Sequence, residues 1–162
     1  MAQTLGVRAM KKLVALSIAA MAFVPVQAMA ATGNLQFNST VTNTCVINVA
    51  SAGTLAPNST FTQLSSKNTG GSPATANVTN TGPDFDLSIS ITSFTGPDAA
   101  TSTTSAEFSG TGDNAFSATG TGVSVSLPGS GTTAVSADFT ADNAAGFSTG
   151  TYASTVTLTC AE

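Results

Sequence analysis

The sequence predicts an all-β fold, arranged as an antiparallel β-sandwich, on three observations. Apolar residues recur with a period of two in several short runs, as in strands that bury one face. Turn-forming stretches such as NTGGSP, NTGPD and LPGSGTT separate these runs. No apolar stripe with the 3.6-residue period of a helix continues beyond two turns. We therefore expect about six to eight antiparallel strands in a single domain.

Six segments carry the period-two pattern. In chain order they are NLQFNSTVTNTCVINV (34–49), ATANVTN (74–80), DFDLSISIT (84–92), GVSVSLP (122–128), AVSADFT (134–140) and TYASTVTLTC (151–160). The residues expected to face the core from these segments are Leu35, Phe37, Val41, Cys45, Ile47, Val49, Ala76, Val78, Phe85, Leu87, Ile89, Ile91, Val123, Val125, Leu127, Val135, Ala137, Phe139, Tyr152, Val156, Leu158 and Cys160. Residues 99–122 are rich in Ser, Thr and Gly, with isolated Phe108 and Phe116, and are expected to form short strands or a long loop.

Residues 1–30 have the features of a secretory signal peptide. Arg8, Lys11 and Lys12 precede an apolar run over residues 13–26, and Ala28 and Ala30 complete an A-x-A cleavage site. The alternative is a retained membrane anchor, but about fourteen apolar residues are too few for a helix that crosses a bilayer. We expect an exported chain that begins near residue 31 and makes no stable membrane insertion after the signal is removed.

The charge and residue types narrow the functions further. Without the signal segment, Lys67 stands alone against the 8 acidic residues, and such a surface repels nucleic acid. The chain has no histidine, the commonest metal ligand and catalytic base. Asp84 and Asp86 could form a catalytic carboxylate pair or a solvated turn, and the GTGDN stretch (110–114) lacks the alternating acids of a calcium loop. The sequence predicts no enzyme, with no catalytic, cofactor-binding or metal-binding residues.

The two cysteines lie near the two ends of the exported chain. Cys45 and Cys160 each fall on the apolar face of a predicted strand, so both side chains are expected to face the same core. An exported chain with two cysteines most often joins them, and the alternative is a pair of free buried thiols. A bond between them would join the first strand to the last. Closing a loop of this length would stabilise the folded state by roughly 4 to 5 kcal/mol.

Two stretches at the ends of the exported chain are ATGNLQFNSTVTNTCVINVASAGTLAP (31–57) and STGTYASTVTLTCAE (148–162), and the second carries the pattern Gly150, Tyr152, Val156, Leu158. Both stretches resemble the spore-coat-U-like domain of archaic chaperone–usher pilins. The chain departs from that family at GTLAPN (53–58), where an aromatic-Gly pair is usual, and in its second cysteine, which commonly falls mid-domain.

This resemblance implies an immunoglobulin-like sandwich that lacks its last strand and is completed by donor-strand addition from a neighbouring subunit. It implies an N-terminal extension (31–43) whose Leu35, Phe37 and Val41 form the donor strand, and a pilin-like domain (44–162). Tyr152, Val156 and Leu158 on the final strand are expected to line the acceptor groove. The alternative is that residues 31–43 form an ordinary edge strand of a self-complete monomer.

The function implied is that of a structural subunit of a surface pilus or fimbria, serving adhesion or biofilm formation. Its expected partners are identical or related subunits, a periplasmic chaperone and an outer-membrane usher. The chain would cross the inner membrane, pass through the periplasm and end in a fimbria at the cell surface. The alternative function is a free-standing exported β-sandwich that binds carbohydrate or associates with a surface layer. The absence of Trp and the single Tyr argue against sugar stacking.

Overall fold

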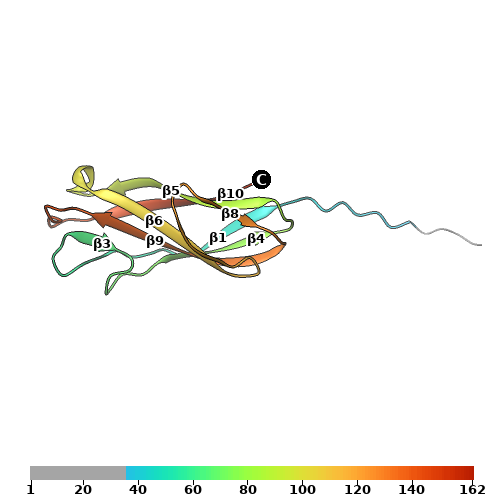
Figure 1. The fold of residues 1–162 in the computed structure, drawn as a ribbon, viewed down its shortest axis with the longest axis horizontal. Helices are drawn as coiled ribbons and strands as arrows, with labels where there is room; N and C mark the ends of the chain where they lie inside the picture. The colour runs from blue at the N-terminus through green and yellow to red at the C-terminus, as the bar shows by residue number, and fades with distance from the viewer. Residues whose placement is uncertain (1–35) are drawn as a thin grey trace, which may run out of the picture. The chain divides into compact units, whose positions relative to one another are not determined.

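Two antiparallel β-sheets pack face to face in the computed structural model of the protein (Figure 1). The structure describes residues 36–162, so the predicted signal peptide and Leu35 lie outside the described residues. Residues 39–162 form one unit. Within the described range, no helix has the length and apolar character needed to cross a membrane. The prediction of an all-β antiparallel fold is confirmed.

Ten strands and one 3₁₀ turn follow one another along the described chain. They are β1 (Cys45–Ser51), β2 (Ala56–Pro57), β3 (Gln63–Ser65), β4 (Ala74–Asn80), β5 (Phe85–Thr95), η1 (Ala99–Thr101), β6 (Thr103–Gly112), β7 (Phe116–Gly120), β8 (Ser124–Leu127), β9 (Gly131–Asp142) and β10 (Ala153–Ala161).

The larger sheet is built around β9. One edge of β9 pairs with β6 along almost its whole length, and β7 continues the sheet beyond β6. The opposite edge pairs first with β4 and then with β3, after which β1 extends the sheet beyond β4 and β2 beyond β3. The smaller sheet has the order β10-β5-β8. The first and last strands of the domain therefore belong to different sheets.

The core lies between the inward faces of β4, β6 and β9 in the larger sheet and of β5 and β8 in the smaller one. Alternate residues on these strands are buried because successive side chains of a strand point to opposite faces. The buried apolar cluster comprises Leu64, Val78, Phe85, Leu87, Ile89, Ala106, Phe108, Leu127, Val135, Phe139 and Ala141.

All six predicted segments contain an observed strand, and the differences from the prediction have physical reasons. In the first segment, residues 36–44 form no strand, and β1 begins at Cys45. The Ser/Thr/Gly-rich stretch contains the ten-residue strand β6, which pairs with β9 and buries Phe108. Val123 was expected to face the core but precedes β8 and is half exposed. The short strands β2 and β3 were not predicted, because each exists through pairing with its neighbour.

One buried hydroxyl in this core lacks a partner. Thr133 on β9 is fully buried opposite Val78, and among the described residues its Oγ1 has no hydrogen bond. An unpartnered buried hydroxyl costs stability, whereas a methyl group of similar shape does not. We expect Thr133→Val to raise the free energy of unfolding by about 1 kcal/mol, measured by denaturant titration.

The neighbouring Thr132 provides the matched control. Its hydroxyl is exposed and lies 3.1 Å from the hydroxyl of Thr79, so Thr132→Val should change stability by less than about 0.5 kcal/mol. A Thr133→Val protein less stable than the wild type would contradict the assignment of an unsatisfied hydroxyl.

Candidate interaction groove between β1 and β10

The sandwich has one side on which two long edge strands face each other without pairing. Among the described residues, β1 pairs only with β4 and β10 pairs only with β5. β1 is an edge strand of the larger sheet and β10 is an edge strand of the smaller one. The outer edge of each strand therefore presents backbone N–H and C=O groups that no strand of the described chain satisfies.

The inward side chains along this side are less buried than those one strand further in. On β4 and β5, Val78 and Leu87 are both 0% exposed. On β1, Val49 has the same inward parity as Cys45 and Ile47, yet it is 77% exposed. On β10, the inward residues Val156, Leu158 and Cys160 are only partly buried. We call the strip between these two strands the β1–β10 groove.

A disulfide joins the two strands at one end of the groove. Cys45 and Cys160 are bonded across a sequence separation of 115, with their Cα atoms 6.4 Å apart. The bond links the first residue of β1 to the eighth residue of β10, and so it links the two sheets. The predicted pairing is confirmed.

A cleft of about 500 Å³ opens at the other end of the groove. Leu55, Ala137 and Phe139 contribute apolar surface to it from the larger sheet, and Tyr152 and Val156 contribute from the start of β10. Several hydroxyl-bearing side chains and Asp138 complete the lining. The cleft therefore has a lining of mixed polarity, into which an apolar side chain with a polar backbone would fit.

Aromatic rings support the wall of this cleft. Phe94 stacks on Tyr152 with ring centroids 6.0 Å apart and contacts Phe139 at 5.5 Å. Phe147 meets Tyr152 edge to face at 5.2 Å. Gly96, at φ +148, has no side chain where the Tyr152 ring passes, and an added Cβ would overlap that ring. The ring of Tyr152 is held in a defined position.

A hydrogen-bonded carboxylate fixes the other end of the Tyr152 side chain. The Tyr152 hydroxyl donates to Asp98 at 2.5 Å and contacts the Ser148 carbonyl oxygen at 3.0 Å. The Ser148 amide donates to the same carboxylate oxygen at 2.6 Å. The hydrogen bond from Tyr152, followed by that from the Ser148 amide, lowers the pKa of Asp98. Partial burial and the Asp98 carboxylate raise the pKa of Tyr152.

The residues predicted for subunit contact lie as follows. Tyr152 lies just before β10, and Val156 and Leu158 lie on its inward face, so all three border the groove. Val41 is 76% exposed and Phe37 is 90% exposed, and neither belongs to a strand. Whether Leu35, Phe37 and Val41 form a donor strand stays a prediction.

Several residues of this side escaped the sequence analysis. Val49 was assigned to the core by its parity, since parity does not show that the facing strand is absent. Asp98 lies in the FTGPDAA stretch, which was interpreted only as a turn. The only indication of its role in the sequence was an acidic residue directly after Gly-Pro. That pattern does not show that Tyr152 would be its hydrogen-bond partner.

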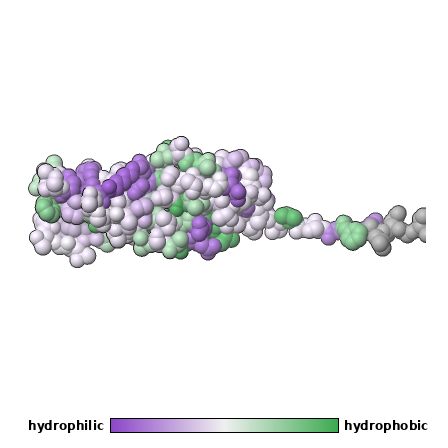
Figure 2. Space-filling view, turned by 90° about the horizontal axis from the view of Figure 1, so that it is seen from below, coloured by the Kyte–Doolittle hydropathy of each residue, from purple (hydrophilic) through white to green (hydrophobic). Residues whose placement is uncertain are grey.

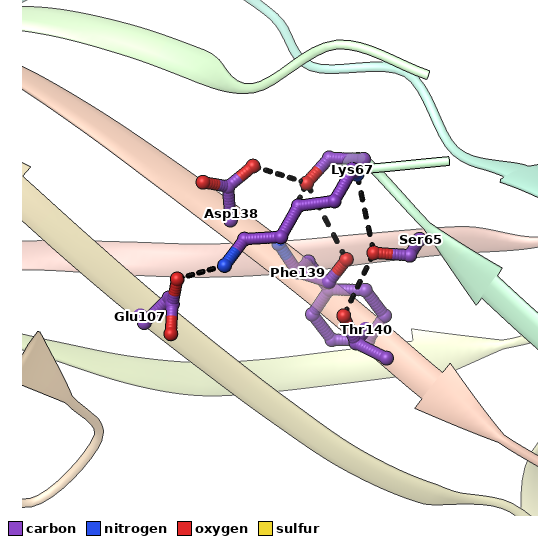
Figure 3. A network of polar contacts seen from close by, with 7 residues as sticks. Ser65, Lys67, Glu107, Asp138, Phe139 and Thr140 are labelled. Carbon is purple, nitrogen blue, oxygen red and sulfur yellow. Dashed lines mark hydrogen bonds and ion pairs between the residues drawn. The ribbon is translucent and has the colours of Figure 1, made fainter. Parts of the chain in front are cut away.

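Polar side chains also connect β6, β9 and the loop after β3. Lys67 pairs with Glu107 and, near it, Ser66 donates to Asp138 at 2.6 Å and accepts from the Phe139 amide (Figure 3). The hydrogen bond to Glu107 is the main cause that raises the pKa of Lys67, against a lowering by desolvation. Both partners of this ion pair are about half exposed, so it contributes little to stability.

The acidic residues considered in the sequence analysis lie at exposed positions or in turns. Asp84 and Asp86 are exposed, and Asp84 adopts φ +73 in the turn before β5. The Asp113 carboxylate accepts the Thr132 amide at 2.8 Å, and the Asn114 side chain accepts the Gly129 amide at 3.1 Å. Among residues 36–162, no three His, Cys, Asp or Glu side chains gather as a metal site would require.

One face of the molecule is mostly weakly polar. Figure 2 shows a face that is mostly pale, with a few strongly hydrophilic areas and several apolar patches. Comparisons of the chain with family models, curated proteins and solved structures found no match.

The disulfide should supply much of the stability of this side. We expect the Cys45→Ser/Cys160→Ser protein to lose roughly 4 to 5 kcal/mol of unfolding free energy, because a loop of this length gains much entropy when it is opened. Denaturant unfolding of the double variant, compared with oxidised wild type, measures the loss. An unchanged unfolding midpoint would show that the bond does not constrain the unfolded chain.

The Asp98–Tyr152 contact should make the free energy of unfolding depend on pH in the acidic range. Because the pKa of Asp98 is lowered in the folded state, its contribution is complete above the ordinary carboxyl value of about 4 and is lost as pH falls through the lowered value. Between about pH 5 and pH 2, wild type should therefore lose more stability than Asp98→Asn. Thermal unfolding across this range measures the difference. Identical pH profiles for wild type and Asp98→Asn would contradict the assignment.

Proposed function

We propose that the protein is a structural subunit of a surface fibre that assembles by strand addition, in which one subunit fills the β1–β10 groove of the next. The observation that carries this proposal is the uncovered inward face of the two edge strands, with Val49 77% exposed at a core position. An extended segment is the occupant that best fits such a site. It would pair its backbone with a free sheet edge and place alternate side chains over the uncovered core.

The segment before β1 has the properties of such an occupant. Phe37 and Val41 share the period-two parity predicted for a strand, and both are strongly exposed. Large apolar side chains gain about 1.5 to 3 kcal/mol each on full burial. A segment that leaves them in water therefore gains considerably from entering an apolar groove. We propose that the 31–43 segment enters the groove of a neighbouring copy with its apolar residues, among them Phe37 and Val41.

The direction of insertion determines the kind of assembly. β10 runs from the cleft, beside Tyr152, to the disulfide at Cys160. A donor strand antiparallel to β10 would emerge at the cleft end, far from the point where the acceptor's own segment leaves at Cys45. Such a contact repeats head to tail and gives an open fibre. A parallel donor would bring the two Cys45 ends together and favour a closed pair, so we propose the antiparallel arrangement.

This arrangement agrees with the resemblance to spore-coat-U-like pilins. The proposed fold class is an immunoglobulin-like sandwich completed in trans. An open groove and an exposed apolar segment invite aggregation, which is the physical reason for a periplasmic chaperone and an outer-membrane usher as partners. The proposed location of the assembled protein is the cell surface, where the fibre would serve adhesion or biofilm formation.

Charge placed on alternate positions of the segment tests the proposal. We expect Phe37→Asp and Val41→Asp, each in the mature chain, to abolish polymers, because a carboxylate would enter the apolar groove. Gln36→Asp and Thr40→Asp lie on the opposite parity and should leave assembly intact. Polymers are measured by size-exclusion chromatography and by resistance to detergent without heating. A synthetic peptide of residues 31–43 should convert the Phe37→Asp protein into a more stable monomer.

A groove variant completes the design. Val156→Asp should fail to accept the peptide while still donating its own segment to wild-type protein. Equal assembly by both parities, or a wild-type monomer that ignores the peptide, would overturn the proposal. In that case, the groove would need an occupant of another kind, such as the carbohydrate of the alternative function.

A further inference from the structure

Phe61 is an exposed aromatic residue in a strained backbone conformation. It lies between β2 and β3 with φ +56, and its side chain is 58% exposed. The left-handed region is unfavourable for a bulky side chain and costs about 1 to 3 kcal/mol. Exposure of the ring gains nothing in the isolated domain. A strained residue that displays apolar surface is therefore a candidate for contact with another molecule.

The surrounding loop holds Phe61 in this conformation. The Asn58 side chain accepts the Thr62 amide at 2.9 Å, and the Phe61 amide donates to the Asn58 carbonyl at 3.1 Å. From the β9–β10 loop, the Phe147 amide donates to the Phe61 carbonyl oxygen at 2.7 Å. The position of the ring is therefore determined by the fold on both sides of the loop.

Phe61 lies at the end of the domain opposite the disulfide. Gln63 pairs with Asp142 at one end of β9, while Gly131 at the other end pairs with Asn80, the partner of Cys45. The 12 residues of β9 separate these ends by roughly 35 to 40 Å. Figure 1 shows the β2–β3, η1 and β9–β10 loops together at the end away from the start of β1. The same end contains the cleft, since Phe147 contacts both Phe61 and Tyr152.

Hydrogen bonds fix the residues just before β1 to their own domain. The Thr81 hydroxyl donates to the Thr42 carbonyl at 3.0 Å and accepts the Thr44 amide at 2.8 Å. The Thr81 amide donates to the Thr44 carbonyl at 3.0 Å. The domain therefore holds its own chain from Thr42 onward. If Val41 lies in the cleft of a neighbour, the next residue already belongs to the donor's body.

We propose that Phe61 packs against a second copy of the chain, on the surface formed by residues 42–46 and 81–84. This inference rests on the proposed fibre function with antiparallel insertion. The opposing surface is uncharged apart from Asp84 and includes exposed Pro83 and Val46, the latter 50% exposed. Phe61 thereby forms an end-to-end contact that stiffens the fibre and slows the release of the donor segment.

Site-specific photo-crosslinking tests the contact directly. Benzoylphenylalanine replaces Phe61 in the full exported chain, with the same replacement at Val123 as a control, since Val123 is 51% exposed beside the middle of β5. Irradiated polymers should give crosslinked dimers from position 61 but not from position 123. Mass spectrometry should place the crosslink in residues 42–46 or 81–84. Monomers filled with the 31–43 peptide should give none.

Depolymerisation measures the strength of the contact. Asn tolerates the left-handed conformation, so Phe61→Asn should fold at least as stably as wild type while it removes the ring. We expect its polymers to dissociate about tenfold faster on heating, since interface changes act mainly on dissociation, while Val123→Asn polymers dissociate at the wild-type rate. Polymers that give no position-61 crosslink and an unchanged rate would overturn the contact and leave the proposed function standing. Absence of polymers in wild type would overturn both.

Discussion

The unpaired edges of β1 and β10 are the constraint on which the rest of this side of the molecule depends. Backbone groups at a sheet edge need hydrogen-bond partners, and inward side chains need a cover. Among the described residues, the facing edges of these two strands have no strand partner, and their inward side chains are only partly covered. The Cys45–Cys160 bond links the two sheets covalently at one end of the groove.

The two ends of the groove are fixed by different chemistry. A covalent bond fixes one end, and at the other Tyr152 is held between aromatic rings and the Asp98 carboxylate. The groove is therefore largely formed before anything binds in it. A preformed site loses little conformational entropy on binding, which favours tight association with an extended segment.

The sequence predicted the fold best where apolar and polar residues alternate. The alternation in residues 84–92 predicted β5, and the predicted export of a chain with two core-facing cysteines predicted their bond. β6 escaped because Ser, Thr and Gly fill most of its positions, which leaves Phe108 as an isolated signal. The exposure of Val49 could not be predicted, because it follows from which strand lies opposite and not from the local pattern. The conformation of Phe61 depends on hydrogen bonds from Asn58 and from the distant β9–β10 loop.

The composition of the edges bears on whether the groove is made for another strand. Proteins usually protect sheet edges by shortness, proline or charge. Three other peripheral strands show the first two devices: β2 has two residues and contains Pro57, β7 has five residues, and β8 has four. β1 and β10 have seven and nine residues, and neither contains a charged residue or a proline. Protection is thus missing only from the two longest of these edges, which face each other across the groove. The lack of protection on β1 and β10 favours edges that pair with another strand.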